Sequence, residues 1–382
     1  MYDASGEDRI DALREKAFET DGEGRVALLR EAVRLADLSN DLRRGMELRD
    51  DLLHAASDAG FFEDELLAFN WMLAQMDRDR ATWGGVEDHL LWCYKWILEH
   101  LPEFPQVSND QLAKTFQDME RRFRRAGHGL KSVHKLRAWA AVRMGDLAEA
   151  ARFEGLWQST QRDRLADCAA CEVGTHVEYL VFAGRDEDAV AAAAPLFGGR
   201  MKCKEVPNTA FSRLLVPLLR SGRQQQAAAC QQQSFAQMRD SRKFISYIAD
   251  HLSFFALAGE ETKAVKLLEA RLPWAEQTRN GFSRFRFDLA ARLLLARLHA
   301  SGRQTLRLRL PSSHPAYRPD DQYATGDLAG LFLGAAREVA SEFDRRNGND
   351  HFTARLIPQN EQLIALPTVP LPEKFRSGLE AA

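Results

Sequence analysis

The chain has 382 residues and a formal net charge of -3, with 45% hydrophobic and 28% charged residues. This balance is typical of a folded globular protein and excludes general disorder, and the weak net charge argues against nucleic acid as the main partner. The first residues lack the pattern of a signal peptide, and no segment approaches the roughly 20 apolar residues of a membrane span. We therefore expect a cytoplasmic protein without membrane association. The sequence does not specify the oligomeric state.

Charge is distributed unevenly along the chain. Asp, Glu, Lys and Arg sum to -13 over residues 1–110, which leaves +10 for residues 111–382 of the total of -3. We expect the two parts to face different partners or to face each other.

The N-terminal region, residues 1–83, shows apolar residues at helical spacing over residues 7–77, as at Val26, Leu29 and Val33. This pattern predicts about four amphipathic helices. Glycines at 24 and 60 lie 36 residues apart, which suggests degenerate repeats. The glycine pair after Trp83 interrupts helical propensity and predicts a hinge.

Two helices are predicted next, over residues 87–100 and from residue 109 to Arg125. Ser108 and Gln111 have the spacing of a capping box at the start of the second helix. The run Arg121–Arg125, continued by Lys131, Lys135 and Arg137, concentrates positive charge. It is suited to RNA, an acidic peptide or the acidic N-terminal region, and a solvated basic corner is the simpler interpretation.

One phrase then recurs four times, with a glycine followed five residues later by alanine. It comprises Gly145–Ala150, Gly184–Ala189, Gly222–Ala227 and Gly259–Ala264, and the glycines lie 39, 38 and 37 residues apart. Such regularity predicts a repeat array of helix pairs, with glycine at each turn and alanine where the paired helices cross. We assign residues 86–303 to this array.

The recurring phrase resembles the turn between the two helices of a tetratricopeptide repeat. The resemblance implies an all-α fold, a right-handed α-solenoid of antiparallel helix pairs, and an adaptor that holds a peptide or a protein partner in its concave groove. The period of 37–39 residues exceeds the usual length of about 34 in that family. We therefore describe the array as tetratricopeptide-like.

In the solenoid that the resemblance implies, the first helix of each pair lines the groove. The alternative for each exposed polar position is a solvated helix face. The residues predicted to bind a partner are Lys135, Trp139, Arg143, Glu178, Ser212, Arg220 and Ser253.

The cysteines carry the sharpest chemical signal. Five cysteines at scattered positions suggest reduced thiols rather than a disulfide framework. Cys168 and Cys171 lie near the start of one first helix and Cys203 just before the next, so stacking could assemble a zinc site, with core packing as the alternative. His176 follows Cys171 by five residues, which places it on another side of the helix.

The C-terminal region, residues 304–382, is expected to form a loop, a capping helix and a proline-containing tail. The loop spans Pro311–Pro319, the helix runs over Asp327–Arg346 and ends before Gly348, and we expect extended chain after it. The tail Leu366–Pro372 favours polyproline II, either as an end cap or as a disordered tail.

No phosphate-binding loop, nucleophile elbow or zinc-protease motif occurs in the sequence. We therefore expect a non-enzymatic scaffold or adaptor without a cofactor, which binds a peptide or protein in its groove. One alternative is a peptide-responsive regulatory sensor with an N-terminal output module. The other is a zinc- or thiol-dependent protein that uses the three cysteines.

Overall fold

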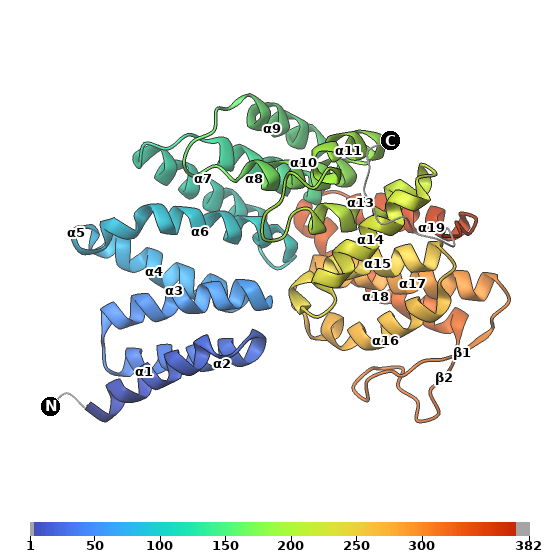
Figure 1. Cartoon of the computed structure of the whole chain (residues 1–382), viewed down its shortest axis with the longest axis horizontal. Coiled ribbons are helices and arrows are strands. Elements are labelled where there is room, and N and C mark those ends of the chain that lie inside the picture. Colours follow the sequence, from blue (N-terminus) through green and yellow to red (C-terminus); the bar gives the residue numbers. More distant parts are fainter. Residues whose placement is uncertain (1–3, 372–382) are drawn as a thin grey trace.

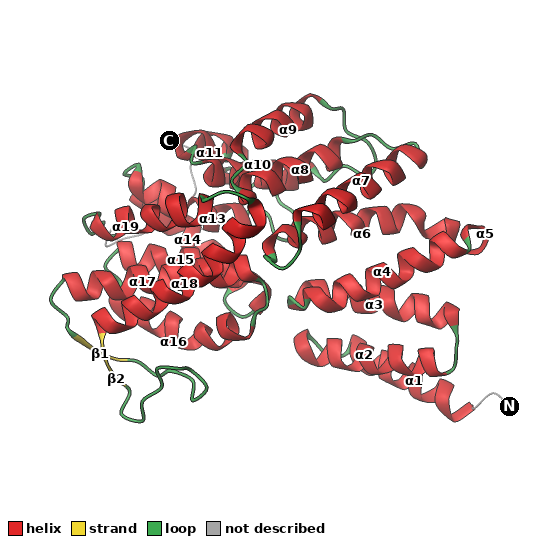
Figure 2. Ribbon diagram, turned by 180° about the vertical axis from the view of Figure 1, so that it is seen from behind, coloured by secondary structure: helices red, strands yellow, loops and turns green. Residues whose placement is uncertain are grey.

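The computed structural model describes residues 4–371, which fold mainly into helices joined by turns and by a few longer loops (Figure 1 and Figure 2). The N-terminal helices are α1 (Ala4–Phe18), α2 (Gly22–Leu38), α3 (Leu42–Ala59), α4 (Phe62–Arg78), α5 (Arg80–Trp83) and η1 (Gly84–Val86). The central ones are α6 (Glu87–His100), η2 (Leu101–Glu103), α7 (Asn109–Arg125), α8 (Lys131–Met144), α9 (Leu147–Ser159), α10 (Ala169–Ala183), α11 (Asp186–Ala192) and α12 (Ala194–Phe197).

The chain continues through further helices and one short hairpin. These elements are α13 (Asn208–Arg220), α14 (Gln224–Met238), η3 (Arg242–Phe244), α15 (Ile245–Leu257), α16 (Glu261–Gln277), α17 (Gly281–Ala300), β1 (Thr305–Arg307), β2 (Gln322–Ala324), α18 (Thr325–Asn347), η4 (His351–Leu356) and α19 (Ile357–Ala365). The strands β1 and β2 pair antiparallel.

The all-helical fold class predicted from the sequence is confirmed, and helices that follow each other in the chain pack together. Helix α8 contacts α9, α13 contacts α14, and α15 contacts α16. The first helices of these pairs also contact each other in succession, from α8 to α10, α13, α15 and α17. One hydrophobic core therefore runs through the array from α8 to α18.

The recurring glycines and alanines have distinct structural roles. All four glycines of the phrase have positive φ, between +73° and +85°, a region that favours glycine. Those after α8 and α10 end their helices in the left-handed conformation. The four alanines, Ala150, Ala189, Ala227 and Ala264, are at most 1% exposed, so the paired helices approach closely where they stand.

The N-terminal helices have a hydrophobic core of their own and also contribute to the neighbouring hydrophobic cluster, which includes residues of α6. Buried residues of α1, α2 and α3 make up one hydrophobic cluster. A second cluster holds Met72 from α4 and Leu91 from α6, on either side of the glycine pair after Trp83, so packing continues across that point. The glycine at 24 lies inside α2, and the chain turns at Gly22 instead, where φ is +60°.

The expectation of extended chain after Gly348 is wrong, because η4 and α19 follow it. The Asp344 carboxylate accepts the backbone N–H groups of Phe352 at 2.8 Å and Thr353 at 3.0 Å, which holds the start of η4. Residues 366–371 are not helical, and Val369 donates to the carbonyl of Leu257 at 2.9 Å. Pro372 lies outside the described residues.

The C-terminal segment returns to the ends of α8 and α10. Asn347 and Asn349 both donate a side-chain N–H to the carbonyl of Met144, at 3.0 and 2.9 Å, at the end of α8. Arg355 donates to the carbonyl of Ala183 at 3.0 Å, at the end of α10. Carbonyl groups in the last turn of a helix have no hydrogen-bond donor within that helix. The side chains of the C-terminal segment therefore supply the donors that these carbonyls lack.

Candidate functional site

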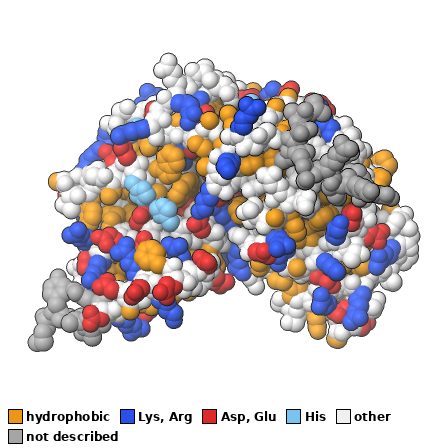
Figure 3. All heavy atoms as spheres, viewed as in Figure 1, with side chains coloured by type: hydrophobic (Ala, Val, Ile, Leu, Met, Phe, Trp, Pro, Cys, Tyr) orange, Lys and Arg blue, Asp and Glu red, His pale blue; other side chains and the backbone are white. Residues whose placement is uncertain are grey.

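A cleft lies between the N-terminal helices and the helices from α13 to α17. It contains two chambers of about 370 Å³ and 340 Å³, here called the first and the second chamber. Figure 3 shows the surface indented between the part that holds α1 to α4 and the part that holds α16. The chambers are parts of one hollow because they share Ser57, Glu99, His100, Lys243 and Tyr247.

Turns and helix ends, rather than helix middles, line most of the first chamber. They are the α3–α4 turn, the end of α6 with η2, the start of α15 and the α16–α17 turn. The aromatic residues of the lining are Phe61, Phe62, Phe104, Trp139, Tyr247 and Trp274. Its basic and acidic residues are Arg30, Arg143, Arg213, Arg242, Lys243, Arg279, Glu63, Asp64, Glu65, Glu99 and Glu103. The chamber thus presents apolar area together with both signs of charge.

Ion pairs cross the cleft from the acidic N-terminal region to the basic remainder. Lys204 Nζ lies 2.6 Å from the carboxylate of Asp58 at the end of α3. Arg279 lies 3.6 Å from Glu63 at the start of α4. The opposite charges of the two parts, visible in the sequence, therefore face each other across the cleft.

Two lysines share one aspartate at the second chamber. Lys95 Nζ lies 2.7 Å from Asp167, and Lys135 also hydrogen bonds to this carboxylate. Burial by itself raises the pKa of Asp167, but the two ammonium groups outweigh it and hold the pKa below its ordinary value. Burial lowers the pKa of Lys95, and Asp167 offsets only part of this. The carboxylate therefore joins α6 and α8 through buried ion pairs.

A buried arginine joins three helices between the two chambers. Arg213 on α13 donates to Glu178 on α10 at 3.2 Å and to Asp250 on α15 at 2.6 Å. The Tyr247 hydroxyl donates to Glu178 at 3.0 Å. Burial by itself lowers the pKa of Arg213, but the nearby carboxylates outweigh this effect and raise the pKa above its ordinary value. These bonds fix the side chains that separate the chambers.

Three polar atoms in the lining of the first chamber have no hydrogen-bond partner within the described part of the chain. They are Trp139 Nε1, Arg143 Nε and Glu65 Oε1, and their residues are 3%, 6% and 2% exposed. Burial raises the pKa of Glu65 to about 7 and lowers the pKa of Arg143 to about 9. Unpaired buried donors and acceptors cost about 1–3 kcal/mol each, so a ligand that pairs with them gains that free energy.

Four of the residues predicted from the sequence line the cleft. Trp139 and Arg143 line the first chamber, and Lys135 and Glu178 line the second. The arginine guanidinium lies over the Trp139 ring, 3.9 Å from its centroid, and pairs with Glu103 of η2. The structure therefore brings these four side chains to one hollow.

The other three predicted residues lie elsewhere. Ser212 is fully buried, with its hydroxyl 3.1 Å from His251 Nε2. Arg220 pairs with Asp186 at 3.2 Å, and Ser253 donates to a carbonyl of its own helix at 2.9 Å. None of the three lines either chamber. Arg213 lines the first chamber in place of Ser212, because each residue turns the helix by about 100°.

Sequence reasoning missed cleft residues from outside the assigned groove helices, and it also missed others at the start of the last groove helix, on which Ser253 was named instead. Glu65 and His100 come from the N-terminal half, and Lys243 and Tyr247 come from η3 and α15. The charge asymmetry between residues 1–110 and the remainder was the one signal that these two parts meet.

The basic run Arg121–Arg125 is paired with nearby carboxylates. Arg122 binds Asp77 at 2.6 Å, and Arg125 binds Glu87 at 3.0 Å. The flanking lysines at 131 and 135 are buried and also paired. This run therefore stabilises the packing of α4, α6 and α7.

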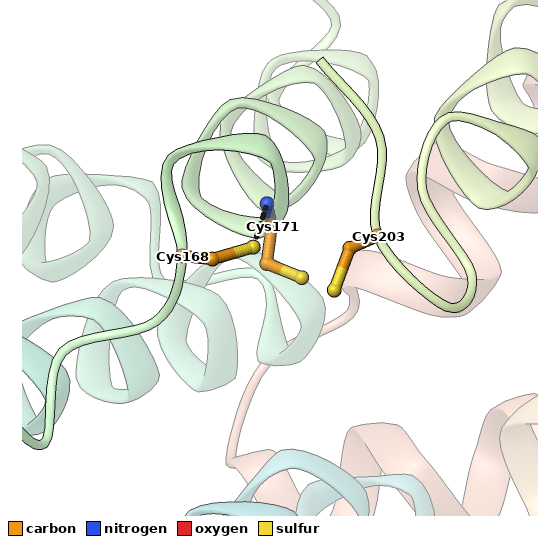
Figure 4. Close-up of side chains that lie close together, drawn as sticks. All are labelled: Cys168, Cys171 and Cys203. Atoms are coloured by element: carbon orange, nitrogen blue, oxygen red, sulfur yellow. Dashed lines mark hydrogen bonds between the residues drawn. The ribbon is translucent and has the colours of Figure 1, made fainter.

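The side chains of three cysteines converge, as Figure 4 shows. The Sγ atoms of Cys168, Cys171 and Cys203 all lie within 4.8 Å of one another, and Cys171 and Cys203 line the second chamber. Cys168 and Cys203 are exposed, unlike typical core cysteines. His176 points elsewhere, because its Nε2 lies 2.8 Å from Glu154 Oε1.

The surroundings of Cys168 and Cys171 change the acidity of these two thiols in opposite directions. Burial alone raises the pKa of Cys168, but the backbone N–H of Cys171 and the neighbouring thiols outweigh this and lower it. Burial, together with hydrogen bonds to the other two thiols, raises the pKa of Cys171. Cys168 is therefore the thiol of this pair that ionises first.

No protein-family model matches the chain, and no curated protein matches it. Among residues 4–371, no helix combines the length and the apolar composition that are needed to cross a bilayer.

Proposed function

We propose that this protein is a non-enzymatic, tetratricopeptide-like scaffold that binds a peptide segment of a partner protein in its two-chamber cleft. The observation that carries the proposal is the set of unpaired polar atoms on Trp139, Arg143 and Glu65. Two of these atoms are N–H donors and one is a carboxyl oxygen, and a peptide backbone offers both the carbonyl and the N–H groups that they lack.

The shape and composition of the cleft support a peptide ligand. A volume of about 370 Å³ lies within the range of ligand-binding pockets, which is about 300–1,000 Å³. Its aromatic residues provide apolar contact area, and its charged residues are mostly paired within the protein. Such a lining favours a segment of mixed composition over a strongly charged polymer.

The test begins with a photo-crosslinking amino acid at Phe62, which lines the first chamber. The control places the same group at Leu147, which is 42% exposed on α9 and lines neither chamber. We expect one partner segment to crosslink at position 62 only. Equal labelling of the same proteins from both positions would contradict the proposal.

A synthetic peptide with the crosslinked sequence then allows affinity to be measured by calorimetry. Trp139→Phe removes the unpaired N–H while keeping an aromatic ring, and we expect about 3- to 10-fold weaker binding from the loss of one hydrogen bond. Trp157→Phe is the control, because Trp157 is buried on α9 and lines neither chamber. Unchanged affinity in Trp139→Phe would show that the peptide binds elsewhere.

The ion pairs across the cleft favour a second candidate function, a regulatory sensor. In this proposal the peptide separates Lys204 from Asp58 and Arg279 from Glu63, and the acidic N-terminal helices act as an output module. Such movement strains the short connection at Gly84, so bound peptide should change the rate of proteolysis there. An unchanged rate with saturating peptide would exclude this candidate.

A further inference from the structure

The three clustered cysteines come from two separate parts of the chain. Cys168 precedes α10 and Cys171 lies in its first turn, whereas Cys203 lies between α12 and α13. The Cys168 Sγ accepts the backbone N–H of Cys171 at 3.4 Å, which places the first two thiols at one helix start. Tertiary packing brings the third to them.

The segment that carries Cys203 is held in place by contacts on both sides. Lys204 pairs with Asp58 at 2.6 Å, and Glu205 pairs with Lys243 at 2.6 Å. A Cβ on Gly174 would lie 2.8 Å from the Val206 side chain, so this segment lies directly against α10. The position of Cys203 beside the other two thiols therefore does not depend on the thiols themselves.

The remaining cysteines provide a contrast within the same protein. Cys93 and Cys230 are fully buried, as is usual for cysteine in a core, whereas Cys168 and Cys203 are exposed and Cys171 is partly buried. Three accessible thiols within 4.8 Å of one another have the proximity and the donor type that a soft divalent metal ion requires.

We propose that Cys168, Cys171 and Cys203 bind one Zn²⁺ ion as thiolates, with the fourth position taken by water or by a ligand group from the second chamber. Among the described residues, no histidine or carboxylate supplies a fourth ligand atom to the group. Three protein ligands leave one position of the tetrahedral ion open to an additional ligand. Binding releases the thiol protons to the buffer.

The proposed site has a structural consequence for the cleft. The ion would join the start of α10 to the segment before α13, and that segment contacts α3 through Lys204 and Asp58. Zinc would therefore hold one wall of the second chamber. This inference is independent of the proposed peptide-binding function, because it concerns the chain without any peptide.

The first experiment uses the reduced full-length protein after removal of metal. Titration with Co²⁺, a spectroscopic substitute for Zn²⁺, is expected to produce thiolate-to-cobalt charge-transfer absorption that saturates at one equivalent. Zn²⁺ should displace the cobalt and protect the three cysteines from alkylation, as identified by peptide mass spectrometry. Absence of the absorption band would overturn the proposal. A disulfide within the group would also overturn it, if the protein still takes up no metal after that disulfide is reduced.

Variants then identify the ligands. Cys203→Ser is expected to weaken Co²⁺ binding by at least about 100-fold, because it removes a direct ligand. Substitution of a residue that only hydrogen bonds to a ligand already lowers metal affinity by up to about 100-fold. Cys230→Ala is the control, because this buried cysteine lies outside the group. Equal affinity of both variants would exclude the site. If Cys203→Ser unfolds, the alkylation pattern of the unmodified protein decides the question.

Discussion

The turn after α3 lies directly against η3, where Gly60 leaves no room for a side chain between its own backbone and that of Lys243. A Cβ atom added to Gly60 would lie 2.9 Å from the Cα atom of Lys243, which is shorter than the contacts that Cβ atoms make in folded proteins. The two residues are 183 positions apart in the sequence. Their contact closes one side of the cleft and brings Glu65 and Tyr247 to the same hollow.

Gly60→Ala tests this contact, and the structure supplies a close control. Gly60 has φ +80°, and Gly127 has φ +77° with open space around it. Both substitutions cost roughly 1–2 kcal/mol of backbone strain, and we expect Gly60→Ala to cost about 1–3 kcal/mol more from steric overlap. Urea unfolding measures the difference. Equal losses in both variants would show that the turn does not dock on Lys243 in solution.

Glu65 should make stability depend on pH in a defined direction. Its pKa in the folded protein is about 7, raised from 4.5 by burial. The folded state therefore binds the proton more tightly than the unfolded state, and this side chain lowers the free energy of unfolding as pH rises from 4.5 through 7. Above pH 7, the burial of the Glu65 carboxylate lowers the free energy of unfolding by its full amount, which is on the order of 3 kcal/mol.

Glu65→Gln removes the titrating group while keeping its size. We expect this variant to be more stable than the unmodified protein at pH 8, by up to about 3 kcal/mol, and the two to converge toward pH 5. Denaturant unfolding at several pH values gives the comparison. A stability difference that stays constant from pH 5 to pH 8 would show that Glu65 keeps an ordinary pKa.

Asp167→Asn should be strongly destabilising, because it leaves Lys95 and Lys135 buried without their shared carboxylate. We expect a loss of about 3–5 kcal/mol in the free energy of unfolding. The pKa of Asp167 is lowered, so its contribution is present above the ordinary value of 3.8 and is lost as pH falls.

The control for this variant is Asp110→Asn. Asp110 pairs with Lys114 at 2.7 Å, and both side chains are about 70% exposed. An exposed pair of this kind contributes less than about 1 kcal/mol. Comparable losses in the two variants would mean that the carboxylate at 167 is solvated in solution.

The alanines of the repeated phrase should not tolerate a larger side chain. Ala189 on α11 is fully buried, whereas Ala191 on the same helix is exposed. We expect Ala189→Leu to cost about 1–3 kcal/mol through overpacking and Ala191→Leu to stay within about 0.5 kcal/mol. Thermal unfolding monitored by circular dichroism separates these outcomes, and similar melting temperatures for the two variants would contradict the close helix crossing.

Features that depend on a few neighbouring residues were predictable from the sequence. Ser108 and Gln111 form the capping box that their spacing indicates, and the repeated glycines adopt positive φ at helix ends. The convergence of Cys203 with Cys168 and Cys171 was also anticipated, from the stacking expected of successive helix pairs. Four of the seven predicted groove residues line the cleft, and at one of the other three positions a rotation of one residue places Arg213 in the lining instead of Ser212.

The amino-acid sequence by itself determined where the helices turn and where paired helices cross, because those features follow from φ preferences, side-chain size and spacing within one or two turns. The tertiary structure alone decided that Gly60 docks on Lys243 and that Asn347 returns to the end of α8. Such contacts depend on the rotation accumulated over many stacked helices. A small change in each crossing angle moves distant segments by many ångströms, so no local pattern specifies which of them meet.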